Sequence, residues 1–371
     1  MLFNIQVLRA IAALLVIHAH AAGPTGLDLA WAGGANGVDL FFVISGFIIA
    51  YVASLDASQF MTRRLLRIVP IYWTSTLALY LLVLAMPRVF HTTSSDPVLL
   101  VRSLAFMPTA SGLHTPDGIP HPTLSGGWTL NYEMYFYAVF AIALTWSRQR
   151  ATWLAVALLL AVLTAIQLTP LRESPVACFY GNPIILEFMY GIAAFHVVRW
   201  VEARRRVAPA LRGEPAALLA GAVLGLAVLV FDYEVFSRAP RWLTYGILQG
   251  ARWTTSGLPA FVVVVCAVLL ERVHQVRITN RWVILTGDAS YVMYLIHAYV
   301  VFGVLRLTLG NHRLAELPGQ LVVLGLMAVS AGAAIAIYRW YEQPILRALK
   351  RQFIAPRPAA IRAAAPGASA R

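Results

Sequence analysis

An arginine and a histidine stand eleven residues apart in "RAIAALLVIHAH", a stretch that is otherwise apolar enough for a membrane helix. Eleven residues advance an α-helix by about three full turns, so Arg9 and His20 share one face, about 16 Å apart along the axis. Ionisable side chains are costly in a bilayer and usually face a bundle interior or an aqueous cavity. The spacing therefore allows them to line opposite ends of one elongated cavity. The alternative is that Arg9 extends to the inner interface and His20 lies among the outer headgroups.

Two carboxylates are expected at about the depth of His20 on other helices. Asp39 lies at the outer end of "GVDLFFVISGF", and Glu133 lies about one turn into the helix that begins in "GGWTLNYEMYFY". A histidine oriented by a carboxylate is a suitable general base for activating a hydroxyl. We therefore predict His20, Asp39 and Glu133 as catalytic residues. Asp39 has an alternative reading as a residue that favours the first turn of a helix.

Arg64 and Arg67 are three residues apart in "RRLLR" and so share a helix face. Guanidinium groups donate hydrogen bonds in a planar fork that suits phosphates. Together with Arg9, they predict a site for a phosphate-bearing donor at the inner side. The alternative is that they only anchor the topology.

Aromatic residues near Glu133 are candidates for contact with a sugar. Trp128, Tyr132 and Tyr137 could pack against sugar faces, or could belong to an aromatic belt at the membrane interface. His297, in "SYVMYLIH", falls in the middle of a predicted span, where an ionisable residue indicates function. We predict these four residues to bind substrate.

Other polar residues have structural explanations. Asp288 and Ser290 are expected to cap a helix, Glu187 to lie at the interface, and Glu342 with Pro344 to mark the end of the last span.

Several other chemistries lack their motifs. His114, Asp117 and His121 lie in a polar loop without the spacing of a structural zinc site, so no metal is predicted. The sequence has no Walker loop or dinucleotide fingerprint, and Ser45 in "VISGF" lacks the preceding glycine of a nucleophile elbow.

The composition of the chain indicates that these residues belong to a membrane protein. The chain has 371 residues, of which 60% are hydrophobic and 12% charged, and its mean hydropathy is +0.71. Such values are outside the usual range of soluble domains. An all-α bundle of about ten membrane spans is predicted, with spans that begin near residues 3, 37, 68, 128, 151, 183, 215, 255, 289 and 319.

The distribution of positive charge predicts the orientation. The net charge is +13, but the arginines fall between the spans, which argues against nucleic acid as a partner. With the N-terminus inside, 20 basic residues lie on the inner side and 8 on the outer side. The positive-inside rule then places both termini in the cytoplasm. A signal peptide cleaved after "AHA" (19 to 21) is disfavoured, because no basic residue precedes Arg9.

We expect one membrane domain over residues 1–349 and a flexible basic cytoplasmic tail over residues 350–371, which is rich in proline, alanine and arginine.

The motifs together resemble a known family. The stretches "LRAIAALLVIHAH", "GVDLFFVISGFII", "RRLLRIVPIYW", "WTLNYEMYFY", "LEFMYGIAAF" and "GDASYVMYLIHAYVV" occur in this order. They resemble the bacterial acyltransferase-3 family of integral membrane acyltransferases, and especially its exopolysaccharide O-acetyltransferases. Arg9 with His20 matches that family's Arg, ten residues, His pattern, and Arg64 with Arg67 matches its Arg, two residues, Arg pattern.

The resemblance implies an O-acetyltransferase of the bacterial cytoplasmic membrane, surrounded by membrane lipids. It would move an acyl group, usually acetyl, from cytoplasmic acyl-CoA to an outward-facing hydroxyl of a polysaccharide or its lipid-linked precursor. Arg9, Arg64 and Arg67 would hold the donor's phosphates, and His20 would act as general base or carry the acyl group. Two alternatives remain: a transporter that uses intramembrane His, Glu and Asp, and an enzyme that acylates a lipid or small hydrophobic acceptor.

Overall fold

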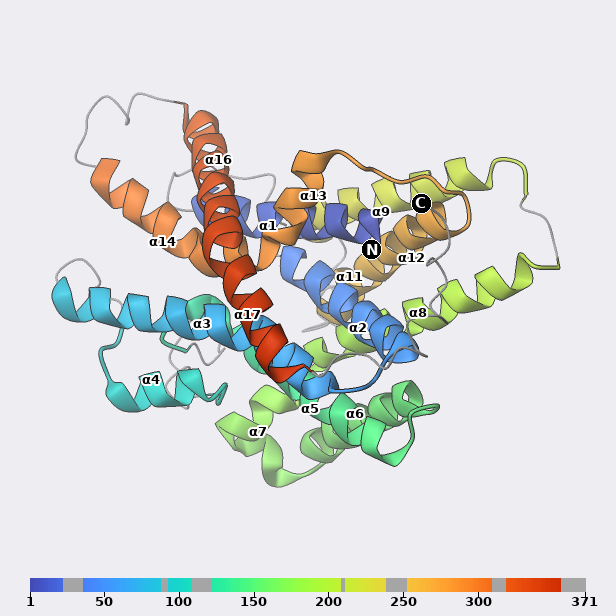
Figure 1. Ribbon diagram of the computed structural model, residues 1–371, viewed down its shortest axis with the longest axis horizontal. Coiled ribbons are helices and arrows are strands. Elements are labelled where there is room, and N and C mark those ends of the chain that lie inside the picture. Colours follow the sequence, from blue (N-terminus) through green and yellow to red (C-terminus); the bar gives the residue numbers. More distant parts are fainter. Residues whose placement is uncertain are drawn as a thin grey trace.

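The computed structural model describes residues 1–22, 36–87, 93–108, 122–207, 211–237, 252–308 and 318–354. Within these ranges every regular element is a helix and no strand occurs, so the predicted all-α fold is confirmed. Figure 1 shows α3, α14 and α16 toward one side of the bundle and α8, α9 and α12 toward the other.

The helices follow the chain in this order: α1 (Phe3–Ala22), α2 (Gly37–Leu55), α3 (Phe60–Ala85), α4 (Pro97–Leu104), η4 (Ser125–Gly127), α5 (Trp128–Trp146), α6 (Ala151–Leu168), η5 (Pro170–Glu173), α7 (Pro175–Tyr180), η6 (Pro183–Ile185), α8 (Leu186–Arg204), α9 (Glu214–Ser237), α11 (Arg252–Thr255), α12 (Gly257–Arg272), α13 (Arg281–Asp288), α14 (Ser290–Thr308), α16 (Gly319–Ile337), η7 (Tyr338–Glu342) and α17 (Gln343–Phe353).

The apolar helices are long enough to cross a membrane. In the described part of the chain, eight helices meet the length and hydropathy that a span requires, and the bent pair α13 and α14 would make nine. Helix α5 is 19 residues long, but polar residues such as Asn131 and Glu133 in its first half lower its hydropathy. The chain is thus a multi-pass helical protein, and the tenth span and the cytoplasmic termini stay predictions.

Side-chain contacts show which helices run in the same direction. On α14, the Tyr291 hydroxyl donates to the Ile68 carbonyl at 2.8 Å, and the Tyr299 hydroxyl donates to the Ser75 carbonyl at 2.8 Å. Helices α14 and α3 therefore run in parallel. The ring contacts of Phe42 with Phe188 and of Phe47 with Phe195 show the same for α2 and α8. Both relationships agree with an alternating up-and-down path through the membrane.

Two glycines allow α2 and α8 to cross closely. A Cβ added to Gly46 would lie 2.1 Å from the Phe188 carbonyl oxygen, and one added to Gly191 would lie 2.2 Å from the Val43 carbonyl oxygen. Any side chain at either position would collide with the backbone of the facing helix. Small residues at such crossings let membrane helices approach closely.

The last span does not end where the sequence predicts. Residues Tyr338–Glu342 form a π-helical turn that leads from α16 directly into α17. Pro344 is in the first turn of α17, where a proline's missing N–H costs nothing, so it does not end the helix. Because α17 extends to Phe353, the first residues of the expected flexible tail are helical. Residues 355–371 lie outside the described residues.

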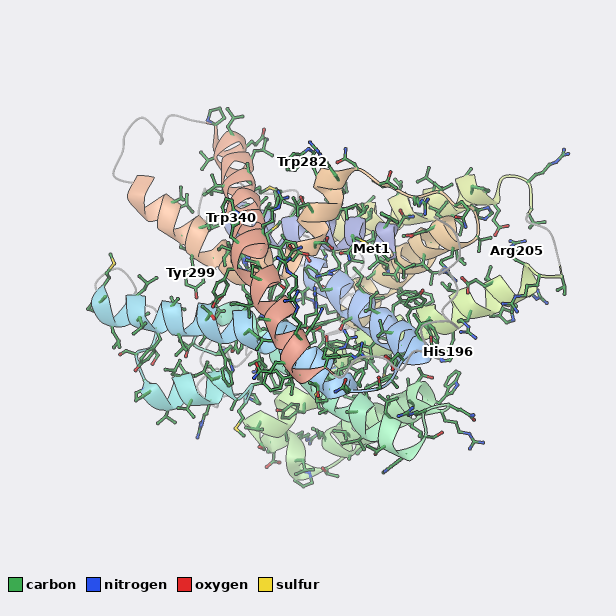
Figure 2. The ribbon with its side chains drawn as sticks, viewed as in Figure 1. Met1, His196, Arg205, Trp282, Tyr299 and Trp340 are labelled. Carbon is green, nitrogen blue, oxygen red and sulfur yellow. The ribbon has the colours of Figure 1, made fainter. Side chains whose placement is uncertain are left out.

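Large apolar side chains cover the outside of the bundle. Trp282 and Trp340 point away from their helices (Figure 2) and are 57% and 80% exposed. An apolar surface of this kind suits contact with lipid tails, and it agrees with the number of long apolar helices.

Candidate active site

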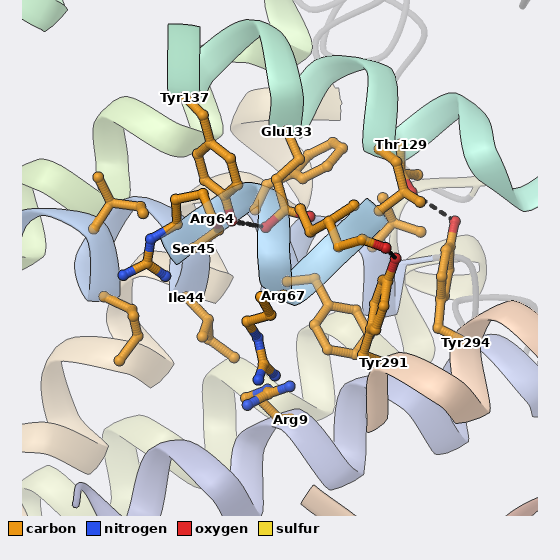
Figure 3. A pocket seen from close by; sticks show the side chains of 17 residues that line it. Arg9, Ile44, Ser45, Arg64, Arg67, Thr129, Glu133, Tyr137, Tyr291 and Tyr294 are labelled. Atoms are coloured by element: carbon orange, nitrogen blue, oxygen red, sulfur yellow. Dashed lines mark hydrogen bonds between the residues drawn. The ribbon is translucent and has the colours of Figure 1, made fainter. Parts of the chain in front are cut away.

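An elongated cavity runs between α1, α2, α3, α5 and α14 (Figure 3), with an empty volume of about 820 Å³ that includes its open mouth. On α2 alone it is lined from Val38 to Ile49, which corresponds to about 16 Å along the helix. Its polar lining consists of Arg9, Ser45, Arg64, Arg67, Thr129, Glu133, Tyr137, Tyr291 and Tyr294.

The predicted arginines meet in this cavity. Arg9 and Arg67 point toward one another from α1 and α3 (Figure 3), close enough for their charges to interact. Arg64 also lines the cavity, but its guanidinium lies apart from this pair (Figure 3), with its carbon 5.7 Å from the Phe60 ring centroid and 6.0 Å from that of Tyr137. In the described structure none of the three makes an ion pair within 4.0 Å, and Arg9 donates only to Gln6 Oε1 at 3.2 Å. Converging cations without a paired carboxylate favour the binding of an anion.

Glu133 supplies the carboxylate that lines the cavity. Its Oε1 accepts a hydrogen bond from the Ser45 hydroxyl at 3.1 Å and another from the Tyr137 hydroxyl. Tyr137 lies one helical turn after Glu133 on α5, so the pair follows from the helix spacing. Glu133 therefore lines the same cavity as the arginines, but its hydrogen bonds come from the Ser45 and Tyr137 hydroxyls.

Two more carboxylates lie near the arginine end of the cavity. Glu342 is fully buried in the π-helical turn, and its carboxylate oxygens have no hydrogen-bond partner within the described ranges. Both Glu342 and Asp288 interact electrostatically with Arg9 and Arg67. From the sequence, both acids are expected to mark the ends of helices. The structure instead places Glu342 in a π-helical turn, a feature that is frequent at functional sites and that the sequence does not indicate.

A tyrosine lines the cavity on the side away from the arginines. The Tyr294 hydroxyl donates to the Gly126 carbonyl at 2.9 Å and accepts from the Thr129 hydroxyl at 2.9 Å. These contacts join α14 to the start of α5. The Tyr294 ring both lines the cavity and contacts the ring of His297.

The predicted histidines lie together beyond Tyr294. The ring centroids of His20 and His297 are 4.8 Å apart, and those of His297 and Tyr294 are 5.8 Å apart. In each histidine Nδ1 bonds to a backbone carbonyl, that of Val16 for His20 at 2.8 Å and that of Tyr294 for His297 at 2.5 Å. A carbonyl oxygen only accepts, so Nδ1 carries the proton and Nε2 keeps its lone pair. His20 is exposed and His297 is 3% exposed.

The expected grouping of His20, Asp39 and Glu133 is not found. The Asp39 oxygens accept from Arg252 Nε and Nη2, each at 2.7 Å, in a two-pronged ion pair between α2 and α11. The orientation of His20 comes from the Val16 carbonyl and not from a carboxylate. Asp39 on α2 faces Arg252 of α11, whereas Glu133 on α5 accepts from Ser45 and Tyr137, so the two carboxylates have different partners.

The interface explanation of Glu187 is wrong, because its side chain is 0% exposed. It lies near the start of α8, where its carboxyl interacts electrostatically with the Asp39 carboxyl and the Arg252 guanidinium. The close crossing of α2 and α8 brings the two acids together. Similarly, the Ser290 hydroxyl has no hydrogen-bond partner in the part of the chain described, so its role as a cap is not observed.

Two of the aromatic candidates pack inside the bundle. Tyr132 is buried, its hydroxyl donates to the Phe179 carbonyl at 2.9 Å, and its ring stacks on that of Phe179 at 4.0 Å. Trp128 contacts the rings of Phe42 and Tyr132. Tyr137 lines the cavity, and contact of any of the three with a sugar stays a prediction.

No group of three or more His, Cys, Asp or Glu residues that could hold a metal occurs among the described residues. His114, Asp117 and His121 lie outside them, so the prediction that they bind no metal is untested.

The helical membrane architecture and its buried polar cavity define the class as a multi-pass membrane protein with an internal site. A family model described as an acyltransferase domain, Acyl_transf_3, matches residues 2–339. The chain belongs to this acyltransferase-3 family and is an acyltransferase, as the motifs predict. Membership argues against the transporter alternative.

Relatives with assigned names agree with the family. The chain is 33% identical over 336 residues to the exopolysaccharide production protein ExoZ of Rhizobium meliloti, covering 88% of this chain and 94% of the relative. It is 26% identical to the peptidoglycan O-acetyltransferase OatA of Listeria monocytogenes over 80% of this chain, but spans only about half, 49%, of that relative. It is 24% identical to the acyltransferase MdmB of Streptomyces mycarofaciens over 86% of this chain and 82% of the relative. No solved structure matches the chain.

Proposed function

We propose that this protein is an O-acetyltransferase of the bacterial cytoplasmic membrane. It transfers an acetyl group from cytoplasmic acyl-CoA to a hydroxyl of an extracytoplasmic polysaccharide or its lipid-linked precursor. The observation that carries the proposal is the elongated cavity with Arg9, Arg64 and Arg67 at one end and the ring of Tyr294, backed by the two histidines, at the other.

The donor fits this cavity by charge and by length. The phosphates of CoA match the three guanidinium groups, which lack a paired carboxylate in the described structure. Pantetheine is an extended arm, and a lining of about 16 Å along α2 accommodates it. With its phosphates at the arginine end, the thioester would lie toward Tyr294.

His20 is the proposed general base. Its Nε2 takes the proton of the acceptor hydroxyl while the hydroxyl oxygen attacks the thioester carbonyl carbon. The C–O bond forms, the C–S bond breaks, and the leaving sulfur takes the proton from the imidazolium, which yields free CoA thiol. Transient transfer of the acyl group to Nε2 is the alternative route, and it uses the same nitrogen.

The path from cavity to base passes through aromatic rings. His20 does not line the cavity; it contacts His297, which contacts Tyr294, which does line it. We propose that the Tyr294 ring moves aside so that the thioester reaches His20. Its hydroxyl contacts with Gly126 and Thr129 are the interactions that would have to break.

A polysaccharide acceptor is proposed from the relatives' names. ExoZ is named for exopolysaccharide production, and OatA for the O-acetylation of peptidoglycan. For this chain we propose the exopolysaccharide class, because the ExoZ similarity extends over nearly the full length of both chains.

The test compares the O-acetyl content of cell-surface polysaccharide in a strain that lacks the gene and in strains that express variants. His20→Ala is expected to give the same loss as the deletion. His18→Ala, two residues away on the same helix, is the matched control and should restore acetylation. Equal O-acetyl content in the deletion, the His20→Ala and the wild-type strains would contradict the proposal.

A further inference from the structure

A second cavity opens between α2, α5, α6 and α8, with an empty volume of about 870 Å³ that includes its mouth. On α2 it is lined by Ala50, Ala53 and Ser54, which lie on a different helix face from Ser45, which lines the arginine cavity. The two cavities are therefore separate sites on different faces of one helix.

The second cavity has an apolar floor and a cationic rim. We call the buried Phe140 and Phe195 and the half-buried Ala53 its floor, and the exposed Arg148 and Arg199 its rim. No aspartate or glutamate is among the lining residues, and neither arginine makes an ion pair within the described part of the chain. Such a site matches a molecule with an anionic head and an apolar body.

A polar contact holds one wall of this cavity in place. His196 Nε2 and the Thr152 hydroxyl are 3.0 Å apart, which ties α8 to the first turn of α6. The His196 ring also stacks on Trp153, with centroids 4.6 Å apart. Figure 2 shows His196 where α2, α6 and α8 come together.

The position of the cavity relative to the membrane follows from exposed tryptophans. Trp200 lines the cavity, Trp153 stacks on His196, and Trp146 ends α5 two residues before Arg148; they are 58%, 61% and 65% exposed. Tryptophans concentrate where lipid headgroups meet the acyl chains. The opening thus lies at headgroup level, at the bundle end to which the C-terminal ends of α2, α5 and α8 point.

We propose that this cavity is a binding site for an anionic phospholipid, whose headgroup phosphate pairs with Arg148 and Arg199 and whose acyl chains lie over the apolar floor. Guanidinium groups at a membrane surface attract anionic lipids, and a phosphate accepts from two of them at once. The proposal needs only the membrane location, and does not depend on acyl-CoA being the donor.

The test measures binding of a fluorescent phosphatidylglycerol to the full-length protein in neutral detergent, by anisotropy. Arg148→Gln with Arg199→Gln is expected to weaken binding roughly 30-fold. Arg150→Gln with Arg212→Gln removes the same charge from exposed positions that do not line the cavity, and should leave the affinity within about twofold.

A second variant keeps both charges. Ala53→Phe fills the apolar floor of the cavity, so it should also weaken lipid binding although Arg148 and Arg199 remain. Monodisperse elution of each variant shows that the fold is kept. Equal weakening by the control pair, equal affinity for phosphatidylcholine, or full competition by inorganic phosphate or CoA at lipid-equivalent concentration would each overturn the proposal.

Discussion

The rings of His20 and His297 meet edge to face, with centroids 4.8 Å apart and an interplanar angle of 67°. They come from α1 and α14, and each ring has its Nδ1 fixed by a backbone carbonyl. Both Nε2 atoms therefore keep a lone pair, and the buried Nε2 of His297 has no hydrogen-bond partner among the described residues. This pair sits beyond the end of the cavity that the three arginines line.

The first prediction concerns His297. His297→Phe keeps a ring against His20 but removes Nε2, and we expect kcat to fall about tenfold to a hundredfold while KM for acyl-CoA stays within twofold. Steady-state kinetics with purified protein measure both parameters. Unchanged kcat would make His297 a packing residue.

The arginines should determine donor affinity. Arg67→Gln is expected to weaken acyl-CoA binding about tenfold to a hundredfold, because it removes a charge-assisted hydrogen bond of about 1.5–3 kcal/mol. Arg63→Gln is the matched control, since Arg63 pairs with Asp56 at 3.1 Å and does not line the cavity. Isothermal titration with CoA distinguishes them, and equal affinities would leave Arg67 as a topology anchor.

Neutralising the two buried acids, Asp39 on α2 and Glu187 on α8, should have different effects on the stability of the protein. Asp39→Asn breaks the two-pronged ion pair with Arg252 and should lower the free energy of unfolding by about 3 kcal/mol, the low end for a buried pair because Arg252 is 35% exposed. Glu187→Gln removes one of the two facing carboxyl groups and should not lower the free energy of unfolding. Thermal unfolding in detergent measures both, and a larger loss for Glu187→Gln would refute this charge balance.

The helix crossing gives a stability prediction that is independent of chemistry. Gly46→Ala places a methyl group 2.1 Å from the Phe188 carbonyl oxygen, and should destabilise the protein by about 1–3 kcal/mol. Gly325→Ala on α16 is the control, since no atom lies within 4 Å of the added Cβ. Similar melting temperatures for the two variants would show that α2 and α8 separate easily.

The sequence predicts the local part of this site well. Arg9, Arg64 and Arg67 could be assigned to one cavity because their spacing fixes a helix face and their charge excludes them from lipid. Pairings between distant helices could not be predicted. Asp39 and Arg252 are 213 residues apart in the chain, and no periodicity in either helix indicates that they meet.

The same limit applies to the acids that were explained as helix ends. Glu342 lies two residues before Pro344, and a proline favours a helix boundary at the residue before it. The π-turn instead continues the helix, which places Glu342 in the interior near the arginines. A local rule of this kind fails when packing of the whole bundle decides the backbone path.

The most direct test of the donor site is a structure of the His20→Ala protein with acetyl-CoA bound, determined by electron cryo-microscopy. Because this variant lacks the base, the donor should remain intact. We predict phosphates in contact with the guanidinium groups of Arg9, Arg64 and Arg67, and the thioester beside residue 20 with the Tyr294 ring displaced. Phosphates bound elsewhere, or a thioester that ends on the arginine side of an unmoved Tyr294, would contradict the account.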